Sequence, residues 1–293
     1  MTATVDLRRA PGAVAIERDV LVVHGPDAVT FLQGQLSQDV AALAVGESRP
    51  TFLLQPTGKV DAWMRVTRTA DDALLLDVDP GWGEVVHARL RRFLLRTKAE
   101  LEPGRWSGLA LRGPGCTAAA APGEGVLRLD AAWSGVEGVD LLGPPGTTVH
   151  TDLPMVPDDA LQALRIEAGV PTMGADVDDT TIPGELGAWA IDASVSFTKG
   201  CYTGQELVAR IDSRGGNVPR PLRGIVLDAS VTVGAGVSVG GADVGRVTSV
   251  GTSPDLGPIA LAVLARSVAP DAEVHIDVDG TPVVGRVREL PLR

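Results

Sequence analysis

Apolar residues recur along the first third of the chain with two different periods. A continuous apolar run at residues 20–24 predicts a buried strand. Between residues 28 and 36 the apolar positions lie three and four apart, which predicts an amphipathic helix, and Asp27 is placed to be its N-cap. Residues 51–54 and 60–67 flank a Pro-Thr-Gly turn and therefore predict a β-hairpin.

The residues that follow the hairpin predict more strands and one long helix. Residues 74–78 predict a strand, and residues 81–95 predict a helix whose arginines lie on its outer face. Short apolar runs at 109–112 and 126–129 predict two further strands. Strands and a single helix between residues 47 and 142 are typical of a separate α+β unit.

The second half of the chain opens with a proline-rich stretch, 144–157, that is typical of a linker. A regularly patterned helix over residues 160–168 follows it and is stopped by Gly169. From residue 219 onward, short valine-rich strands alternate with glycine turns, and Asp279-Gly280 is a strong hairpin signal. This spacing predicts a small antiparallel barrel of about six strands.

Composition limits the classes of protein that these elements can form. The chain has 293 residues, enough for two or three domains, and 44% of them are apolar. No apolar run reaches the roughly 18 residues of a membrane helix, and the N-terminus lacks a signal-peptide pattern, so we expect a cytoplasmic protein with no membrane partner. The formal net charge of −11 argues against nucleic acid as a partner. Two cysteines and four scattered histidines indicate neither a disulfide scaffold nor a metal site, and a monomer is expected.

Residues 199–206, Lys-Gly-Cys-Tyr-Thr-Gly-Gln-Glu, bring rare side chains together. The segment contains the chain's single tyrosine, Tyr202, and one of its two cysteines, Cys201. It also contains Lys199, one of only three lysines among 26 basic residues. We interpret this concentration as a functional motif.

The local pattern predicts that the Cys201 thiol is reactive. Thr203 and Glu206 fit a capping box with Thr203 as the N-cap, so Cys201 would lie two residues ahead of a helix start, near the positive end of the helix dipole. Lys199 adds a neighbouring cation. Both effects favour the thiolate, so the pKa of Cys201 is expected below the free value of about 8.5. The alternative is a small, buried and inert cysteine in a strand-to-helix turn.

Three stretches of the chain carry a resemblance to a known family. Residues 23–40 contain Phe-Leu-Gln-Gly-Gln-Leu-Ser-Gln-Asp-Val after a His-Gly-Pro-Asp turn. Residues 164–171 read Leu-Arg-Ile-Glu-Ala-Gly-Val-Pro and are followed by Gly174 and Asp176. Together with the segment at 199–206, these stretches resemble the folate-binding YgfZ-type proteins, relatives of the glycine-cleavage aminomethyltransferase (T-protein).

The resemblance implies an α+β fold of three domains in an aminomethyltransferase-like cloverleaf, with a C-terminal antiparallel β-barrel. A folate-binding first domain would be split between residues 1–46 and 143–218, a second domain would be inserted at 47–142, and the barrel would occupy 219–293. The resemblance also implies tetrahydrofolate, or a one-carbon derivative of it, as the ligand. It further implies a role in the assembly or repair of iron–sulfur enzymes, with iron–sulfur client or assembly proteins as partners.

The resemblance also assigns roles to individual residues. Cys201 would act as a thiolate on a folate-borne carbon unit, a cluster component or a partner protein. Lys199 would hold that thiolate or a folate carboxylate, unless it is a solvated surface lysine. Tyr202 would contact the ligand at the edge of the cavity, or serve as a half-buried core residue. Glu167 matches the superfamily glutamate that contacts the pterin ring, or lies on the surface of an amphipathic helix.

Four further candidates lie in the N-terminal part of the chain. Gln33 and Gln35 would line the cavity, or cap and pack the first helix. Lys59 and Asp61 lie in the predicted hairpin, where the aminomethyltransferases carry their catalytic aspartate, and are the candidate ligand-binding and catalytic residues there. The paired aspartates of that family are not reproduced, because Asp61 is followed by Ala62. This departure puts aminomethyl transfer in doubt.

The leading hypothesis is therefore a tetrahydrofolate-binding accessory protein for iron–sulfur enzymes that is not a conventional turnover enzyme. A folate-dependent aminomethyl or one-carbon transferase is the second hypothesis, although Asp61 is its only candidate acid or base. A cysteine hydrolase is the third, and no histidine lies in a recognisable catalytic motif near Cys201.

Overall fold

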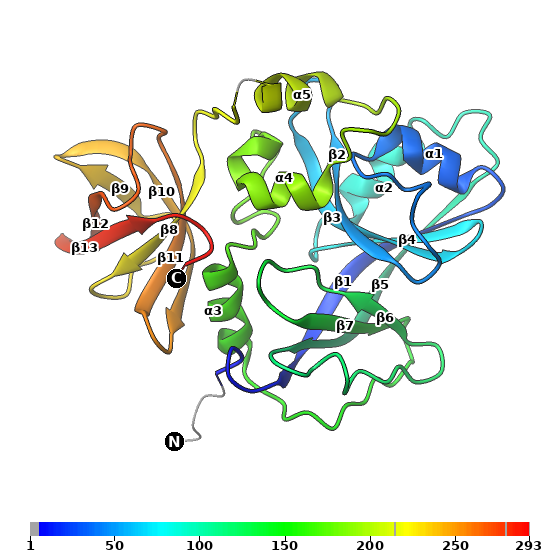
Figure 1. The fold of residues 1–293 in the computed structure, drawn as a ribbon, viewed down its shortest axis with the longest axis horizontal. Coiled ribbons are helices and arrows are strands. Elements are labelled where there is room, and N and C mark those ends of the chain that lie inside the picture. Colours follow the sequence, from blue (N-terminus) through cyan, green and yellow to red (C-terminus); the bar gives the residue numbers. More distant parts are fainter. Residues whose placement is uncertain (1–5, 214, 279, 293) are drawn as a thin grey trace.

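The computed structural model describes residues 6–213, 215–278 and 280–292. The strands form two separate β structures, an open sheet and a closed barrel, with helices beside and between them (Figure 1). This arrangement confirms the predicted α+β class. Within the described residues, no helix has the length and apolar character needed to cross a membrane.

The open sheet has seven strands and is antiparallel throughout. Its strands are β1 (Gly12–His24), β2 (Ser48–Leu54), β3 (Val60–Ala70), β4 (Ala73–Val78), β5 (Glu100–Arg112), β6 (Leu127–Asp130) and β7 (Gly138–Gly143). They follow the order β2-β3-β4-β1-β5-β7-β6, so the first strand of the chain lies in the middle of the sheet. The predicted boundary at residue 47 therefore lies between two strands of one sheet, β1 and β2, and the division into a split and an inserted domain stays a prediction.

Five α-helices and one short 3₁₀ helix accompany the strands that the structure describes. They are α1 (Ala28–Gln35), α2 (Gly83–Arg91), α3 (Asp158–Ala168), η1 (Pro183–Leu186), α4 (Ala188–Ser194) and α5 (Gln205–Ser213). The stop predicted for α3 is confirmed, because Gly169 ends it with a φ of 71°. Asp27 precedes α1 as predicted but does not cap it, since its carboxylate accepts the Lys98 N–H at 2.7 Å instead. The helix predicted over 81–95 ends early, at Arg91, and the chain continues in turns.

The C-terminal part of the chain forms the predicted antiparallel barrel, which closes in the order β10-β11-β8-β13-β12-β9. Its strands are β8 (Leu222–Leu227), β9 (Gly236–Val239), β10 (Ala242–Ser253), β11 (Gly257–Leu264), β12 (Glu273–Val278) and β13 (Thr281–Arg288). β12 and β13 pair as a hairpin that ends at Val278 opposite Thr281, where a turn was predicted; Asp279 of that turn lies outside the described residues. Buried valine, isoleucine, leucine and alanine side chains fill the interior of the barrel.

Helix α3 lies between the barrel and the sheet (Figure 1). It packs against β10 and β11 of the barrel and against β1 of the sheet. Leu164 and Ile166 of α3 are buried, and Gly251 of β10 allows close approach, because a Cβ there would stand 3.1 Å from the Ile166 side chain. This helix therefore joins the barrel to the sheet.

Candidate functional site

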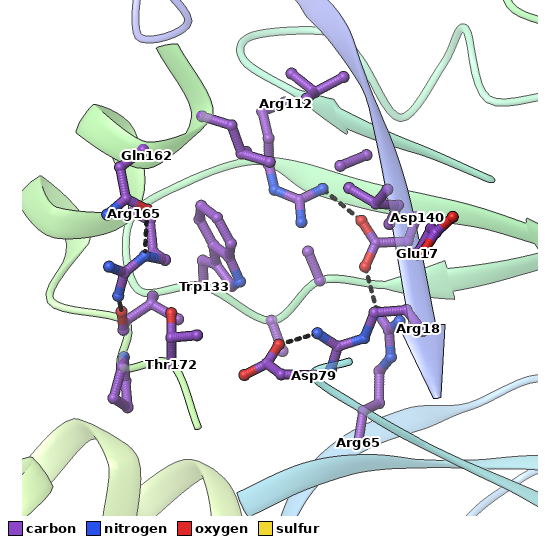
Figure 2. A pocket seen from close by; sticks show the side chains of 18 of the residues that line it. Glu17, Arg18, Arg65, Asp79, Arg112, Trp133, Asp140, Gln162, Arg165 and Thr172 are labelled. Carbon is purple, nitrogen blue, oxygen red and sulfur yellow. Dashed lines mark hydrogen bonds and ion pairs between the residues drawn. The ribbon is translucent and has the colours of Figure 1, made fainter. Parts of the chain in front are cut away.

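A cavity of about 620 Å³ lies between one face of the sheet and the helices α3 and α4. Strands β1, β3, β5 and β7 supply one wall of the cavity, and α3 and α4 supply another. Figure 2 shows the ring of Trp133 between the α3 side chains and a group of arginines and aspartates. The lining thus combines apolar surface with a small set of charged groups.

The best-buried charged group of this cavity is centred on Asp140. Arg65 donates to both carboxylate oxygens of Asp77, at 2.8 and 3.0 Å, and also to Asp140 at 2.9 Å. Arg112 donates to the other oxygen of Asp140 at 2.8 Å. Burial by itself would raise the pKa of Asp140, but Arg112 and Arg65 hold it at about 2, so this carboxylate is ionised at neutral pH.

Arg18 extends the same network along β1. It donates to Asp77 at 3.0 Å and is paired with Asp79. The three arginines and three aspartates carry opposite formal charges in equal number, which keeps this wall of the cavity close to neutral. The members of this network are Arg18, Arg65, Arg112, Asp77, Asp79 and Asp140.

Three tryptophans make most of the aromatic surface of the cavity. The Arg112 guanidinium lies over the Trp133 ring, 4.4 Å from its centroid. Trp63 of β3 and Trp189 of α4 meet edge to face, with their centroids 6.1 Å apart. Planar rings that line a partly apolar space are suited to hold a flat heterocycle.

Arg165 of α3 lines the cavity but also joins the sheet side to the barrel. It donates to Asp176 at 2.8 Å, to the carbonyl of Val170 at 2.6 Å and to Ser249 of β10 at 2.7 Å. Asp176 in turn accepts from Thr248 and Ser249, at 2.6 and 2.8 Å. Part of the Arg-x-Glu-x-Gly stretch is therefore a structural connection to the barrel.

Glu167 does not line this cavity. The structure places it in a separate cavity of about 500 Å³ between α3, the end of β10 and the N-terminal segment. Its carboxylate pairs with Arg8 at 3.2 Å, and burial raises its pKa although Ser253 and Arg8 act in the opposite direction. A pterin contact for Glu167 stays a prediction, whereas Asp140 is the buried carboxylate among those that line the 620 Å³ cavity.

The segment at 199–206 lies away from both cavities, and Cys201 is exposed at its surface. The Lys199 ammonium donates to three backbone carbonyls after and within α1, at 2.6, 2.6 and 2.8 Å. Since an ammonium has three donors, none remains for the thiolate or folate carboxylate that we expected it to hold. Burial lowers the pKa of Lys199 to about 8, with Asp39 opposing that shift. Tyr202 is buried, with its ring centroid 5.2 Å from the Lys199 ammonium, in agreement with the alternative that it serves as a core residue.

The helix after this segment begins later than the pattern predicted. α5 starts at Gln205, so the N-cap position belongs to Gly204 and not to Thr203. Gln205 instead accepts the Tyr202 N–H through its side chain at 3.3 Å. Cys201 therefore lies four positions ahead of the helix, farther from its dipole than the capping box would have placed it.

The structure places Gln33 and Gln35, the two glutamines of α1, outside the cavity lining. Gln33 donates to Asp39 at 2.9 Å and accepts the Ala41 N–H at 3.1 Å, which braces the loop after α1. Gln35 is partly buried, and its side-chain oxygen has no hydrogen-bond partner among the described residues. Neither glutamine lines the 620 Å³ cavity.

The hairpin residues also lie outside the cavity lining. Asp61 is paired with Arg89 of α2 at 2.9 Å, and Lys59 is partly buried in the turn before β3. That turn packs on the cysteine segment, because a Cβ on Gly58 would stand 3.1 Å from the Gly204 carbonyl oxygen. The structure thus places the turn that contains Lys59 against the cysteine segment and leaves Asp61 in an ion pair.

Comparisons with known proteins agree with this architecture. Residues 220–292 match the glycine cleavage T-protein C-terminal barrel domain. The crystal structure of glycine cleavage system aminomethyltransferase T from Bartonella henselae superposes with a TM-score of 0.81 at 23% identity, covering 98% of this chain and 88% of that one. The predicted aminomethyltransferase-like fold with a C-terminal antiparallel barrel is thereby confirmed.

Two relatives align with about two thirds of the chain. An uncharacterized protein of Haemophilus influenzae is 30% identical over 205 residues, covering 68% of this chain and 67% of that protein. The tRNA-modifying protein YgfZ of Edwardsiella ictaluri is 29% identical over 218 residues, covering 67% of this chain and 65% of that protein. The chain therefore spans about two thirds of the length of these relatives.

Proposed function

The chain belongs to the YgfZ-type branch of the glycine-cleavage T-protein superfamily, and on this premise we propose that it is a tetrahydrofolate-binding accessory protein for iron–sulfur enzymes. The folate would occupy the 620 Å³ cavity, and Cys201 would act on a partner protein in the cytoplasm. The observation that carries the folate part is Asp140, a buried and ionised carboxylate on the wall of a tryptophan-lined cavity.

The residues of the cavity fit a folate ring. A volume of about 620 Å³ lies within the roughly 300–1,000 Å³ that is usual for ligand sites. Each oxygen of Asp140 already accepts one arginine hydrogen bond, and each can accept another from the amino and N–H edge of a pterin. The Nε of Arg112 is a buried donor with no partner among the described residues, a further polar group that a bound ring can satisfy.

Tetrahydrofolate supplies, when bound, a carrier for a one-carbon unit. The chain's own residues would orient it: Asp140 through hydrogen bonds, and Trp63 and Trp133 through their ring faces. Cys201 is exposed and does not line the cavity, so its thiol is available to a macromolecule. The formal charge of −11 disfavours contact with an RNA backbone, which supports a protein as that partner. The iron–sulfur role follows from the family resemblance together with this accessible thiol.

A one-carbon transferase is the second candidate, because the fold is that of an aminomethyltransferase. The hairpin argues against it, since Asp61 is held by Arg89 and the next residue, Ala62, is fully buried. Incubation with tetrahydrofolate and an aminomethyl or methyl donor separates the two functions. Multiple turnovers to methylene- or methyl-folate would establish the transferase, and a lack of turnover despite binding supports the accessory role.

Titration of the protein with tetrahydrofolate, followed by calorimetry, tests the folate proposal. We expect saturable binding to the wild type and a roughly 10- to 100-fold weaker affinity for Asp140→Asn, which loses a charged acceptor. Trp133→Leu tests the same wall with a change that leaves the ion pairs of Asp140 in place. Glu167→Gln is the matched control, because it neutralises a buried carboxylate of the other cavity.

The outcome also decides between the two carboxylates. Affinity within twofold of wild type for Glu167→Gln supports the cavity that contains Asp140. Loss of affinity in Glu167→Gln with no loss in Asp140→Asn or Trp133→Leu would restore the pterin role predicted for Glu167 and overturn this location. No binding to the wild type would reject tetrahydrofolate as the ligand.

A further inference from the structure

One side chain of the cavity wall is hydrogen-bonded to the helix that leads into the cysteine segment. Trp63 of β3 lines the cavity, and its indole N–H donates to the hydroxyl of Ser194 at 3.0 Å. Ser194 is the last residue of α4 and is fully buried. The chain then runs directly from Ser194 to Cys201, so the wall and the thiol are joined through a short stretch of backbone.

Ser37, in the loop after α1, fixes the beginning of that stretch. Its hydroxyl donates to the Ser194 carbonyl at 2.7 Å and accepts the Phe52 N–H of β2 at 2.8 Å. Its own carbonyl accepts the Ser196 N–H at 2.9 Å. Ser37 is fully buried, so each of these groups would lie unpaired in a dry environment if the contact opened.

Lys199 fixes the other end of the stretch on the same loop. Its ammonium donates to the carbonyls of Gln33, Leu36 and Gln38 at 2.6, 2.6 and 2.8 Å. Its backbone N–H donates to the Ser196 hydroxyl at 3.3 Å. The loop after α1 therefore contacts both ends of residues 194–199, and Cys201 follows two positions later.

We propose that Ser37 and Lys199 are positioning residues that couple the cavity wall at Trp63 to the segment carrying Cys201. A ligand that packs on Trp63 then holds α4 in place and suppresses local opening of residues 195–203. Because a ligand that binds only the closed form stabilises it by mass action, occupancy of the cavity is transmitted to the cysteine segment. This inference rests on the proposed function for the identity of the ligand, whereas the coupling itself is a property of the contacts above.

Backbone amide hydrogen exchange of residues 195–203 measures the coupling, first without any ligand. Trp63→Phe keeps the ring but removes the bond to Ser194, and we expect exchange in this segment to quicken roughly three- to tenfold. Trp133→Phe is the matched control, because it makes the same substitution at another tryptophan of the cavity and leaves the α4 contacts in place. Unchanged exchange in Trp63→Phe, or equal acceleration in Trp133→Phe, would overturn the coupling.

The same measurement with tetrahydrofolate at about 100 times its dissociation constant tests transmission from the cavity. Exchange in the wild type is expected to slow by at least tenfold, up to the roughly 100-fold limit set by mass action. Ser37→Ala should bind with affinity within threefold of wild type, measured by calorimetry, yet show less than threefold protection of this segment. Binding without protection in the wild type, or full protection in Ser37→Ala, rejects the inference and leaves the proposed function intact. A wild type that does not bind tetrahydrofolate rejects the proposed function, and the ligand-free comparison of the two tryptophan variants still decides the coupling.

Discussion

Asp140→Asn is the perturbation with the most definite consequence for this fold. The carboxylate lies on β7 and accepts charged hydrogen bonds from Arg65 of β3 and Arg112 of β5 at 2.9 and 2.8 Å. An amide has one carbonyl oxygen and presents donors where the second arginine needs an acceptor. Arg65 keeps its two hydrogen bonds to the Asp77 carboxylate, so the substitution removes more of the charged hydrogen bonding of Arg112 than of Arg65. Breaking a buried ion pair on one side costs about 3–5 kcal/mol, and we expect a loss of about 3 kcal/mol in the free energy of unfolding at pH 7.

The pH dependence gives an independent magnitude. The pKa of Asp140 falls from an ordinary 3.8 to about 2 in the folded protein, so the folded state binds its proton less readily than the unfolded chain. Its contribution to stability is therefore fully present above pH 3.8 and is lost as the pH falls toward 2. At about 1.4 kcal/mol for each pKa unit, the full contribution is about 2 kcal/mol, of which about 1 kcal/mol is lost by pH 3.

Urea unfolding of wild type and Asp140→Asn at pH 7, 5 and 3 checks both values. The difference between the two proteins should stay constant from pH 7 to 5 and narrow by about 1 kcal/mol at pH 3. Asp130→Asn is the control, because this aspartate is 58% exposed at the end of β6 and pairs with Arg128 at 3.4 Å. We expect it to cost less than about 0.5 kcal/mol. A loss below about 1 kcal/mol in Asp140→Asn, or a difference that does not change between pH 5 and 3, would falsify the assignment of Asp140 as a buried, ionised centre.

Three further predictions concern the cysteine segment. Iodoacetamide should modify one thiol in the native protein and two after unfolding, because Cys201 is exposed while Cys116 is buried with a pKa raised by burial. Cys201→Ser should abolish labelling of the native protein, and Cys116→Ser should leave it unchanged. Modification of two thiols in the native protein would contradict this prediction. Lys199→Met leaves three carbonyls without their charged donor and should lower the free energy of unfolding, measured in urea, by about 2 kcal/mol. An unchanged free energy of unfolding would argue that these three hydrogen bonds do not stabilise the fold. Gly204→Ala should destabilise the protein by more than about 1 kcal/mol, since Gly204 has a φ of 80° and an added Cβ would stand 2.5 Å from a backbone oxygen. The control Gly200→Ala meets open space and should be neutral. Equal thermal midpoints for the two variants would refute the close packing of Gly204.

Elements with a local pattern were predictable from the sequence, and those whose pattern depends on distant partners were not. The α1 helix, the β2–β3 hairpin and the end of α3 at Gly169 each have a short-range signal, and each is confirmed. β5 was predicted only over 109–112, because its first nine residues are largely exposed and have no apolar run to mark them. They are strand because they pair along the whole length of β1, which is information that no window of sequence contains.

The candidate site divides in the same way. The pattern identified an exposed and distinctive thiol at Cys201, but it did not identify Asp140, which lies 75 positions from Arg65 and 28 from Arg112. A usable signal was nevertheless present. Arg65 and Asp140 are charged residues with an apolar residue directly before and after each of them. A charged side chain within such an apolar stretch is a candidate for a buried charge, which requires a partner. Two such charges of opposite sign are expected to form an ion pair with each other.

The rarity of the side chains in residues 199–206 indicated constraint without indicating its kind. Within the motif the structure separates two kinds: Lys199 and Tyr202 turn inward, onto carbonyls and core, and Cys201 alone among these three is exposed. An ammonium with all its donors used and a buried ring are adequately explained by support of the segment. An exposed thiol gains nothing from packing. Its support by the half-buried Lys199 and the buried Tyr202 is best explained by a function that requires the sulfur at a fixed place on the surface. Reactivity and position are thus carried by different residues of one motif, and substitution of the supporting residues should impair function even though neither contacts the reacting atoms.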